Sequence, residues 1–271
     1  MVESIPNFSV LMSLYNNEKS CYLHDCLNSL FIQTLPASEI VLVLDGPIDE
    51  HLIVTIEEWK EKLPLKIFPI TTNVGLGKAL NYGLDKCSND IVCRMDTDDI
   101  CIPKRFEKQI NYLMKHPNLC ALGSAIQEFN GKDRGKIRFS RTGSKNIFNY
   151  AKKRNPLNHM TVVFRKKYIL AVDGYQHHLY MEDYNLWLRL MAAGYELDNL
   201  EEPLVNARVG NGMIKRRKGW KYIQSEFKLY ILKKQLGIDS GFSAFNILLI
   251  RTIPRILPHV VLSKLYSFLR N

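Results

Sequence analysis

The first hundred residues alternate short apolar runs with stretches of helical periodicity, and this alternation limits the fold more than any other feature of the sequence. Four apolar runs have the length of strands, at residues 8–14, 40–44, 66–70 and 91–95. Three stretches with helical spacing separate them, at residues 23–31, 52–62 and 78–86. Unbroken apolar runs are typical of strands buried on both faces. The βαβα units predict a parallel, doubly wound α/β sheet with right-handed crossovers and helices on both faces.

The rest of the chain carries weaker signals and ends in a basic segment. We predict a helix from Pro103 to Lys115, strands and loops over residues 119–164, and a short helix from Glu182 to Gly194. The formal net charge is +10, and residues 215–270 hold 12 Lys and Arg against two acids, which leaves 25 residues of each sign before them. The whole excess of positive charge therefore belongs to the C-terminal segment.

Length, cysteine pattern and the first residues exclude several classes of protein. With 271 residues, of which 46% are hydrophobic, the chain can bury the core of one large α/β domain or two small ones. Six cysteines at irregular spacing include no C-x-x-C pair, which argues against a zinc site and against a disulfide framework. No basic start followed by an apolar run opens the sequence, so we expect a cytosolic protein.

Polar clusters follow three of the predicted strands. The clusters Tyr15-Asn16-Asn17-Glu18, Asp45-Gly46 and Asp96-Thr97-Asp98-Asp99 each begin where an apolar run stops. Ligands of doubly wound sheets bind at the carboxyl ends of the strands. The three clusters are therefore predicted to share one crevice.

The three aspartates of the last cluster are the strongest candidates for chemistry. Neighbouring carboxylates repel one another unless a cation or hydrogen-bond donors compensate. Mg²⁺ and Mn²⁺ prefer oxygen ligands and combine one or two carboxylates with substrate phosphates and water. The alternative is a loop in which Asp98 or Asp99 caps the next helix, but a cap accounts for only one of the three. We predict a metal site.

Other candidate sites each allow two interpretations. Asp45 either accepts hydrogen bonds from a base or ribose, or belongs to an ordinary Asp-Gly-Pro turn. The segment Asn73-Val-Gly-Leu-Gly-Lys78 resembles a phosphate loop only loosely, and its glycines also fit a tight turn before a helix that its Asn caps. Glu182 and Asp183 stand at a helix start, where they favour the dipole or, near a bound donor, act as a general base. His159 either binds metal or phosphate or satisfies a buried hydrogen bond.

The basic segment begins with Lys215-Arg216-Arg217-Lys218, close to Trp220. These bases are suited to a diphosphate, to an anionic membrane or to a solvated surface. Two aliphatic stretches with bases follow, at residues 242–251 and 253–270, and neither has the roughly 20 uninterrupted apolar residues of a membrane-spanning helix. They predict either a pair of basic amphipathic helices at a membrane interface or a hairpin packed on the core.

Five segments taken together resemble the family 2 glycosyltransferases. They keep the order and spacing of that family over about the first 210 residues: Val10-Leu-Met-Ser-Leu-Tyr-Asn16, Leu44-Asp-Gly46, Asn73-Val-Gly-Leu-Gly-Lys-Ala-Leu-Asn81, Arg94-Met-Asp-Thr-Asp-Asp99 and Met181-Glu-Asp-Tyr-Asn-Leu-Trp-Leu-Arg189. The resemblance implies the GT-A fold, in which a Rossmann-like α/β sheet binds a nucleotide-diphosphate sugar and is joined to an acceptor-binding half. It also implies transfer with inversion at the anomeric carbon in a single displacement.

The resemblance implies a role for each matching residue. The residues expected at the uridine are Tyr15, Asn16, Glu18 and Asp45. Those expected around the ribose and phosphates are Asn73, Gly75, Lys78, Arg94 and Asp96. The metal, Mn²⁺ or Mg²⁺, is expected on Asp98, with Asp96, Asp99 and His159 as further candidate ligands. Asp183 is the expected general base, with Glu182 as second candidate.

A shorter likeness lies in the tail. The stretch Arg208-Val-Gly-Asn-Gly-Met-Ile-Lys-Arg-Arg-Lys-Gly-Trp220 is similar to one in bacterial O-antigen and capsule transferases that extend a sugar on diphospho-undecaprenol. It implies that Lys215, Arg216 and Arg217 bind a lipid-linked diphosphate, with the protein peripheral on the cytoplasmic face of the inner membrane. The implied reaction transfers a hexose, galactose before glucose, from a UDP-sugar to GlcNAc or GalNAc on the lipid diphosphate and forms a β-linkage in O-antigen or capsule synthesis.

The chain is expected to consist of three parts. We expect a nucleotide-sugar-binding part at residues 1–105, an acceptor-binding part of the same domain at 106–210 and a basic amphipathic membrane-associating segment at 211–271. A nucleotidyltransferase would need a glycine-rich basic loop where Tyr15-Asn16-Asn17-Glu18 stands. A non-enzymatic binding module is the other alternative, and because RNA-binding motifs are absent from the sequence we expect no nucleic acid partner. An acceptor later in the repeat unit, a protein glycan and a homodimer are left open.

Overall fold

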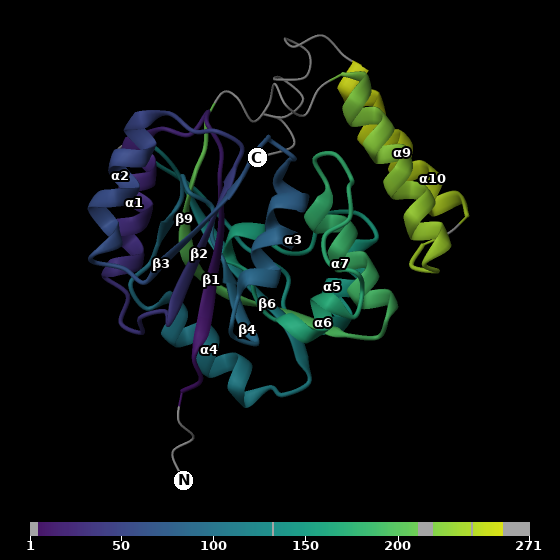
Figure 1. Ribbon diagram of the computed structural model, residues 1–271. Helices are drawn as coiled ribbons and strands as arrows, with labels where there is room; N and C mark the ends of the chain where they lie inside the picture. Colours follow the sequence, from purple (N-terminus) through teal and green to yellow (C-terminus); the bar gives the residue numbers. More distant parts are fainter. Residues whose placement is uncertain (1–4, 132, 211–218, 240, 257–271) are drawn as a thin grey trace.

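The computed structural model describes residues 5–131, 133–210, 219–239 and 241–256. Figure 1 shows a central sheet between two layers of helices, with the pair α9 (Trp220–Gln235) and α10 (Phe242–Ile256) at one side. The sheet and the two helix layers position the site. The pair α9 and α10 lies beside the helix layer on one face of the sheet.

The first half of the sheet follows the predicted pattern. Its strands are β1 (Phe8–Leu14), β2 (Glu39–Asp45), β3 (Leu65–Ile70) and β4 (Ile91–Arg94), and all neighbours among them are parallel. The connecting helices are α1 (Ser20–Phe31), α2 (Glu50–Lys60) and α3 (Leu76–Lys86). The spatial order β3-β2-β1-β4 confirms a parallel, doubly wound arrangement for this half.

The second half of the sheet is mixed. It consists of β5 (Ile100–Cys101), β6 (Leu119–Asn130), β7 (Asp133–Arg138), β8 (Val163–Arg165) and β9 (Glu196–Arg208). Strand β8 lies antiparallel between β4 and β6, whereas β9 is parallel to β6 and antiparallel to β5. One sheet therefore runs through both of the expected parts of the domain, and the boundary between them stays a prediction.

Two apolar cores lie on opposite faces of the sheet. Along β1 the side chains alternate, so Leu11 belongs to one core and Met12 to the other. Helices α1, α2 and α4 (Arg105–Lys115) cover the face of Met12, and α3, α5 (Ser144–Ala151) and α7 (Glu182–Ala192) cover the face of Leu11. Helix α3 approaches closely because Gly83 lacks a side chain, and a Cβ there would lie 2.5 Å from Leu11 Cδ1.

Besides α9, for which no helix was predicted, two larger elements differ from the sequence prediction. Helix α5 lies in the region for which only strands and loops were predicted, because a helix of eight residues shows little periodicity beyond the buried pair Ile147 and Ala151. Strand β9 was not predicted, because acidic residues interrupt its apolar positions. The short elements η1 (His159–Thr161) and α6 (Lys166–Leu170) flank β8.

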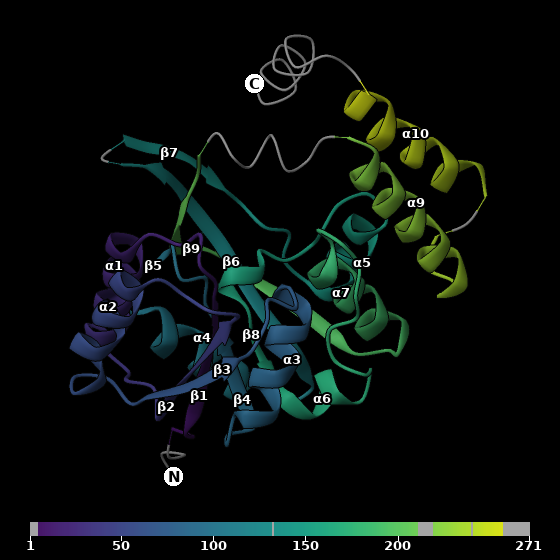
Figure 2. The ribbon, with the colours of Figure 1, turned by 45° about the horizontal axis from the view of Figure 1, so that its top comes forward.

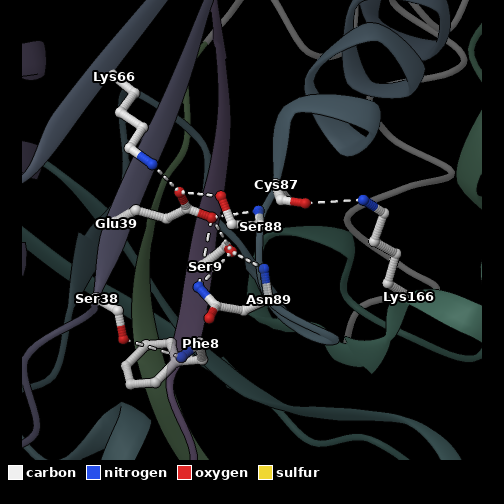
Figure 3. A network of polar contacts seen from close by, with 9 residues as sticks. All are labelled: Phe8, Ser9, Ser38, Glu39, Lys66, Cys87, Ser88, Asn89 and Lys166. Atoms are coloured by element: carbon white, nitrogen blue, oxygen red, sulfur yellow. Dashed lines mark hydrogen bonds and ion pairs between the residues drawn. The ribbon is translucent and has the colours of Figure 1, made fainter.

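The amino-terminal end of the parallel strands holds a buried carboxylate. Glu39 is 2% exposed and accepts hydrogen bonds from Ser9 Oγ, Ser88 N and Lys66 Nζ, each at 2.6 Å (Figure 3). Burial opposes the charge, but the hydrogen bonds from Lys66, Ser9 and Ser88 together outweigh it and lower the pKa of Glu39 to about 2. The network ties β1, β2 and β3 to the turn before β4.

Helices α9 and α10 pack beside α5 and α7 (Figure 2). They also expose apolar side chains. Tyr222 and Leu229 of α9 belong to the same core as α7. The predicted break between the stretches 242–251 and 253–270 is wrong, because α10 runs through it. The exposed apolar side chains of the pair include Trp220, Phe227, Ile231, Phe242, Phe245 and Ile250. Within the described ranges, no helix combines the length and apolar character needed to cross a bilayer. Lys215, Arg216 and Arg217, and residues 257–270 of the last aliphatic stretch, lie outside the described residues.

Candidate active site

The first and third polar clusters are neighbours in space because β1 and β4 are adjacent strands. Glu18 Oε2 accepts a hydrogen bond from Thr97 Oγ1 at 3.1 Å. Cys26 of α1 places its Sγ 3.2 Å from the carbonyl oxygen of Asp96. The side chains of Tyr15 and Asn16 are exposed at the same strand end. The loops after β1 and β4 thus form one continuous edge.

Asp45 of the second cluster fixes the turn before α3. Its Oδ1 accepts a hydrogen bond from Val74 N at 2.7 Å and its Oδ2 one from Gly75 N at 3.1 Å, while Asn73 Nδ2 donates to the Asp45 carbonyl at 3.1 Å. Gly46 has φ +90°, and a Cβ there would lie 2.8 Å from Asn73 N, so the contact requires glycine. Asp45 shapes the turn between β3 and α3 in this way, and its contact with uridine stays a prediction.

The glycines of the same turn allow a close contact between the two halves of the site. Helix α3 begins after Gly75 without a side-chain cap, so the alternative in which Asn73 caps this helix is wrong. A Cβ at Gly77 would lie only 3.1 Å from Glu182 Cγ, so the start of α7 rests directly on the first turn of α3. Lys78 is exposed beside this contact.

The three aspartates after β4 come together as predicted for a metal site. One ligand atom from each of Asp96, Asp98 and Asp99 lies within 4.8 Å of the others. Helix α4 has Lys104 at its N-cap position and no side-chain cap, so the alternative in which an aspartate caps it is wrong. The three carboxylates are available for another task.

The protein contacts of the three carboxylates differ. Asp96 forms an ion pair with Arg94. Asp99 is 2% exposed, and its Oδ1 accepts a hydrogen bond from the backbone N of Arg208 at 2.7 Å, where β9 ends. Asp98 forms no ion pair anywhere in the described part of the chain. Asp98 is therefore best placed to offer its oxygens to a cation.

Burial and the close spacing of these carboxylates raise the pKa of two of them. Burial, followed by the charges of Asp96 and Glu18, raises the pKa of Asp98 to about 7. Burial and the charges of Asp96 and Asp98 raise the pKa of Asp99 well above its usual value. Both directions mean that the charged cluster costs free energy unless a cation or a proton relieves it.

Arg94 is 1% exposed and lies beneath the site. Its Nε has no hydrogen-bond partner within the described residues. Its charge acts on both sides of the crevice, because it counteracts the rise in the pKa of Asp98 and of Asp183. Arg94 reaches the crevice through Asp96, and its direct contact with ribose or phosphates stays a prediction.

Asp183 and Glu182 form a second acidic pair in the first turn of α7. Asp183 Oδ2 accepts a hydrogen bond from Asn155 Nδ2 at 2.6 Å, and its Oδ1 accepts one from Tyr184 N at 2.7 Å. Burial raises the pKa of Asp183, and the donation from Asn155 is the largest effect in the opposite direction. A carboxylate oriented by the Asn155 side chain and the Tyr184 backbone N–H, and with a raised pKa, is suited to take up a proton.

In the described part of the chain, His159 contacts aromatic residues and not the aspartate cluster. Its Nε2 is 2.9 Å from the hydroxyl of Tyr175, and its ring lies edge-on to Trp187. Burial, and then the charge of Arg94, lower the pKa of His159 well below its usual value, so the ring is neutral. The structure thus shows the buried hydrogen bond that was one of its two interpretations, and ligation of a metal by His159 stays a prediction.

Two residues of the site were not singled out from the sequence. Asn155 contacts Asp183 from a loop 28 residues away, and Arg208 joins β9 to the aspartate loop through its backbone N and through Nε, which donates to the Asp98 carbonyl at 2.9 Å. Periodicity gives no sign of either contact. Arg208 did open the tail stretch that carried the second likeness.

Fold and site together define a class of protein. A mixed sheet whose parallel half ends in an acidic cluster, faced by a second acidic pair on a helix, is the arrangement of a GT-A glycosyltransferase. The crystal structure of Staphylococcus aureus TarS 1-349 in complex with UDP-GlcNAc has a TM-score of 0.70 to this chain, over 91% of this chain and 72% of that one, at 21% identity. The mannosyltransferase PcManGT from Pyrobaculum calidifontis, in complex with GDP-Man and Mn²⁺, has a TM-score of 0.65 over 92% and 70%, at 15% identity. The predicted GT-A fold is confirmed.

The chain belongs to glycosyl transferase family 2, because the model of that family matches residues 9–173. The amylovoran biosynthesis glycosyltransferase AmsE of Erwinia amylovora is 49% identical over 96% of this chain and 98% of its own length. The UDP-Gal:alpha-D-GlcNAc-diphosphoundecaprenol beta-1,3-galactosyltransferase of Escherichia coli is 38% identical over 84% of this chain and 83% of its own length. The predicted family, and with it the prediction of a sugar-transferring enzyme, is confirmed.

Proposed function

We propose that the chain transfers a hexose from a UDP-sugar to a sugar carried on a lipid diphosphate, with inversion at the anomeric carbon. The observation that carries the proposal is the pair of acidic sites that share the field of Arg94, namely the Asp96–Asp99 cluster and Asp183. The name of the Escherichia coli relative supports a UDP-galactose donor and a GlcNAc-diphospho-undecaprenol acceptor. UDP-glucose is the second donor, GalNAc the second acceptor sugar.

The residues of the chain divide the reaction between two walls. On one wall the turn held by Asp45 and the exposed side chains of Tyr15 and Asn16 bind the uridine. On the other, Asp183 removes the proton from an acceptor hydroxyl while that oxygen attacks the anomeric carbon. The bond from this carbon to UDP breaks on the opposite face, so an α-linked donor yields a β-linked product. Asn155 orients the carboxylate that takes up the proton.

The aspartate cluster fits Mn²⁺ or Mg²⁺. Its oxygens are close enough to share one ion, and their crowded charges favour a divalent cation. Asp98 is the first candidate ligand, followed by Asp96 and Asp99. When bound, the cation would stabilise the charge that develops on the departing diphosphate.

The test uses the purified chain, Mn²⁺ and a panel of UDP-sugars with synthetic GlcNAc- and GalNAc-diphospholipid acceptors. We expect β-linked transfer that is lost on chelation of the metal. Asp183→Asn should abolish turnover and leave UDP affinity nearly unchanged, and Asp98→Ala should lose metal-dependent transfer. Full metal-dependent activity of Asp98→Ala would refute the metal assignment.

We also propose that α9 and α10 bring the protein to the cytoplasmic face of the inner membrane. Trp220, Phe242 and Ile250 are at least 70% exposed, and Lys221, Lys228 and Lys234 are exposed on the same helix pair. Apolar side chains with bases are suited to an anionic lipid surface. Lys215, Arg216 and Arg217, which precede α9 in the chain, are proposed to bind the diphosphate of the acceptor.

Vesicle sedimentation tests the membrane proposal. The full chain should bind vesicles of anionic lipid more tightly than vesicles of neutral lipid, and the triple variant Trp220→Ser, Phe242→Ser, Ile250→Ser should lose this binding. Ile53→Ser on α2 is the matched control, since Ile53 is 46% exposed on another surface. Equal binding by the triple variant would contradict the proposal.

We also propose a homodimer, which light scattering of the same protein tests.

A further inference from the structure

The end of helix α5 is held by side chains from three other helices. The last carbonyl groups of a helix have no partner within it. Here the carbonyl of Ala151 accepts the hydroxyl of Tyr184 from α7. The next two carbonyls accept Lys233 Nζ of α9 at 2.7 Å (Lys152 O) and Arg251 Nη1 of α10 at 2.8 Å (Lys153 O). Three consecutive carbonyls are thus fixed by side chains distant in the sequence.

The two cations of the helix pair are costly to keep at this place. Lys233 is 5% exposed, and burial, followed by the charge of Arg251, lowers the pKa of Lys233 to about 8. Arg251 Nε contacts Glu226 Oε2 at 2.6 Å, and Glu226 is 2% exposed. Packing of α9 alone would not need charged groups here, since apolar residues of similar volume often stabilise as well or better. Besides the ion pair of Arg251 with Glu226, both cations donate to the carbonyls that follow α5.

The same segment leads directly to the partner of the base. Asn155 follows Lys153 by two residues, and its Nδ2 donates to Asp183 Oδ2 at 2.6 Å. Figure 2 shows α5 and α7 side by side, next to the α9–α10 pair. A shift of the segment 151–155 would therefore move the amide that orients the carboxylate.

We propose that the α9–α10 pair is part of the catalytic apparatus: Lys233 and Arg251 fix the segment 151–155, and Asn155 in turn positions the carboxylate of Asp183. The inference rests on the proposed function, because it assumes that Asp183 is the base. Asn155, Lys233 and Arg251 are positioning residues that act through Asp183. The C-terminal helices then serve turnover as well as any membrane contact.

The titration of Asp183 provides a readout that a merely structural role would not change. The charged and titratable groups that act on it are Arg94 of β4, Tyr175 of the loop before α7, and Glu182 and Tyr184 of its own helix. None of these groups is altered in the variants below. Removal of the amide of Asn155 takes away a donor that favours the ionised carboxylate, so the acid limb of the pH profile should move to higher pH.

The experiment measures kcat, KM for the UDP-sugar and the pH profile of kcat/KM in the full chain, with a detergent-solubilised acceptor so that vesicle binding does not enter. We expect Asn155→Ala to lower kcat about 10- to 100-fold, with KM nearly unchanged and the acid limb shifted upward. Lys233→Met should lower kcat about 3- to 10-fold in the same direction. Lys115→Met, which removes an exposed lysine at the end of α4, is the matched control and should behave as the wild type.

The double variant Asn155→Ala, Lys233→Met separates the proposed route from loss of folding. If Lys233 acts through Asn155, the second change should lower kcat little further, whereas fully additive effects would overturn the proposal. A wild-type kcat and pH profile in Lys233→Met would also overturn the proposal. So would an equal loss of UDP affinity and turnover in Asn155→Ala or Lys233→Met. An inactive wild type, or an active Asp183→Asn, would instead refute the proposed function.

Discussion

Two acidic sites, one buried and one partly buried, lie at opposite ends of the same parallel strands, and their surroundings differ in kind. At the amino end, Glu39 is surrounded by donors, and its pKa falls to about 2 although burial alone would raise it. At the carboxyl end, partial burial of Asp98 and the negative charges of Asp96 and Glu18 raise the pKa of Asp98 to about 7. Both sites depend on the parallel order of β2, β1 and β4, which brings the starts of these strands to one edge and their ends to the other.

The difference separates stability from function. The Glu39 network supplies donors from within the protein and stabilises the junction of three strands. The aspartate cluster lacks enough cations of its own, and its unfavourable charge is the reason that it suits a divalent ion. Active sites often hold such locally unfavourable arrangements, which the rest of the fold must offset.

The largest effect should come from removing the crowded carboxylate. Asp98→Asn is expected to lower transfer about 1,000-fold, because the charge that develops on the departing diphosphate loses its compensation. The free energy of unfolding of the metal-free protein should rise by about 1 kcal/mol, because one repelling charge disappears. Kinetics and urea unfolding measure the two effects, with the exposed Asp85→Asn of α3 as control. A loss of stability in Asp98→Asn would contradict the comparison.

The opposite result is expected at the amino end. Glu39→Gln should lower the free energy of unfolding by roughly 2 to 3 kcal/mol, because the amide cannot replace a carboxylate that accepts from five donor groups. The kcat of the folded fraction should stay at the wild-type value. Glu57→Gln is the control, since Glu57 forms only an exposed ion pair with Lys60. Equal stability of both variants would show that the network contributes little.

The pH dependence of stability should carry the same signature. The folded pKa of Glu39, about 2, lies below the ordinary 4.5. Its contribution is therefore complete above about pH 4.5 and is lost as the pH falls toward 2. Thermal unfolding between pH 5 and pH 2.5 should show a smaller decline in Glu39→Gln than in the wild type. Parallel curves for the two proteins would rule out this contribution.

Metal addition should stabilise only through the carboxyl end. At ten times its dissociation constant, Mn²⁺ is expected to add about 1.4 kcal/mol to the free energy of unfolding. Glu39→Gln should keep this gain, and Asp98→Asn should lose most of it. Melting temperatures with and without Mn²⁺ provide the measurement, and an unchanged gain in Asp98→Asn would place the ion elsewhere.

The smallest effect concerns the contact that joins the two walls of the crevice. Gly77→Ala should push Glu182 Cγ, which lies 3.1 Å from the added Cβ, by a few tenths of an ångström. We expect kcat to fall only a few-fold, while stability is kept or rises because Ala is the better helix former. Wild-type kcat in this variant would mean that Glu182 yields without disturbing Asp183.

The sequence predicted the parallel half of the sheet closely. Strand β1 has the predicted bounds, and β2 and β3 differ by single residues at their ends. The prediction succeeded there because apolar residues predominate in each strand, although β1 contains two serines and β3 contains Lys66. It failed for α5 and β9, whose positions in the fold are set by packing against β6 and α7 and leave only a weak trace in the order of residues.

By itself the sequence determined where the acidic groups follow the strands, which family the chain resembles, and that its positive charge belongs to the tail. Only the tertiary structure decided how those groups are used. It joined Asp99 to Arg208 across 109 residues, Asp183 to Asn155, and the tail cations to the end of α5. The physical reason is that periodicity records which face of an element is buried, whereas hydrogen bonds and burial of charge depend on which distant elements come to lie against it.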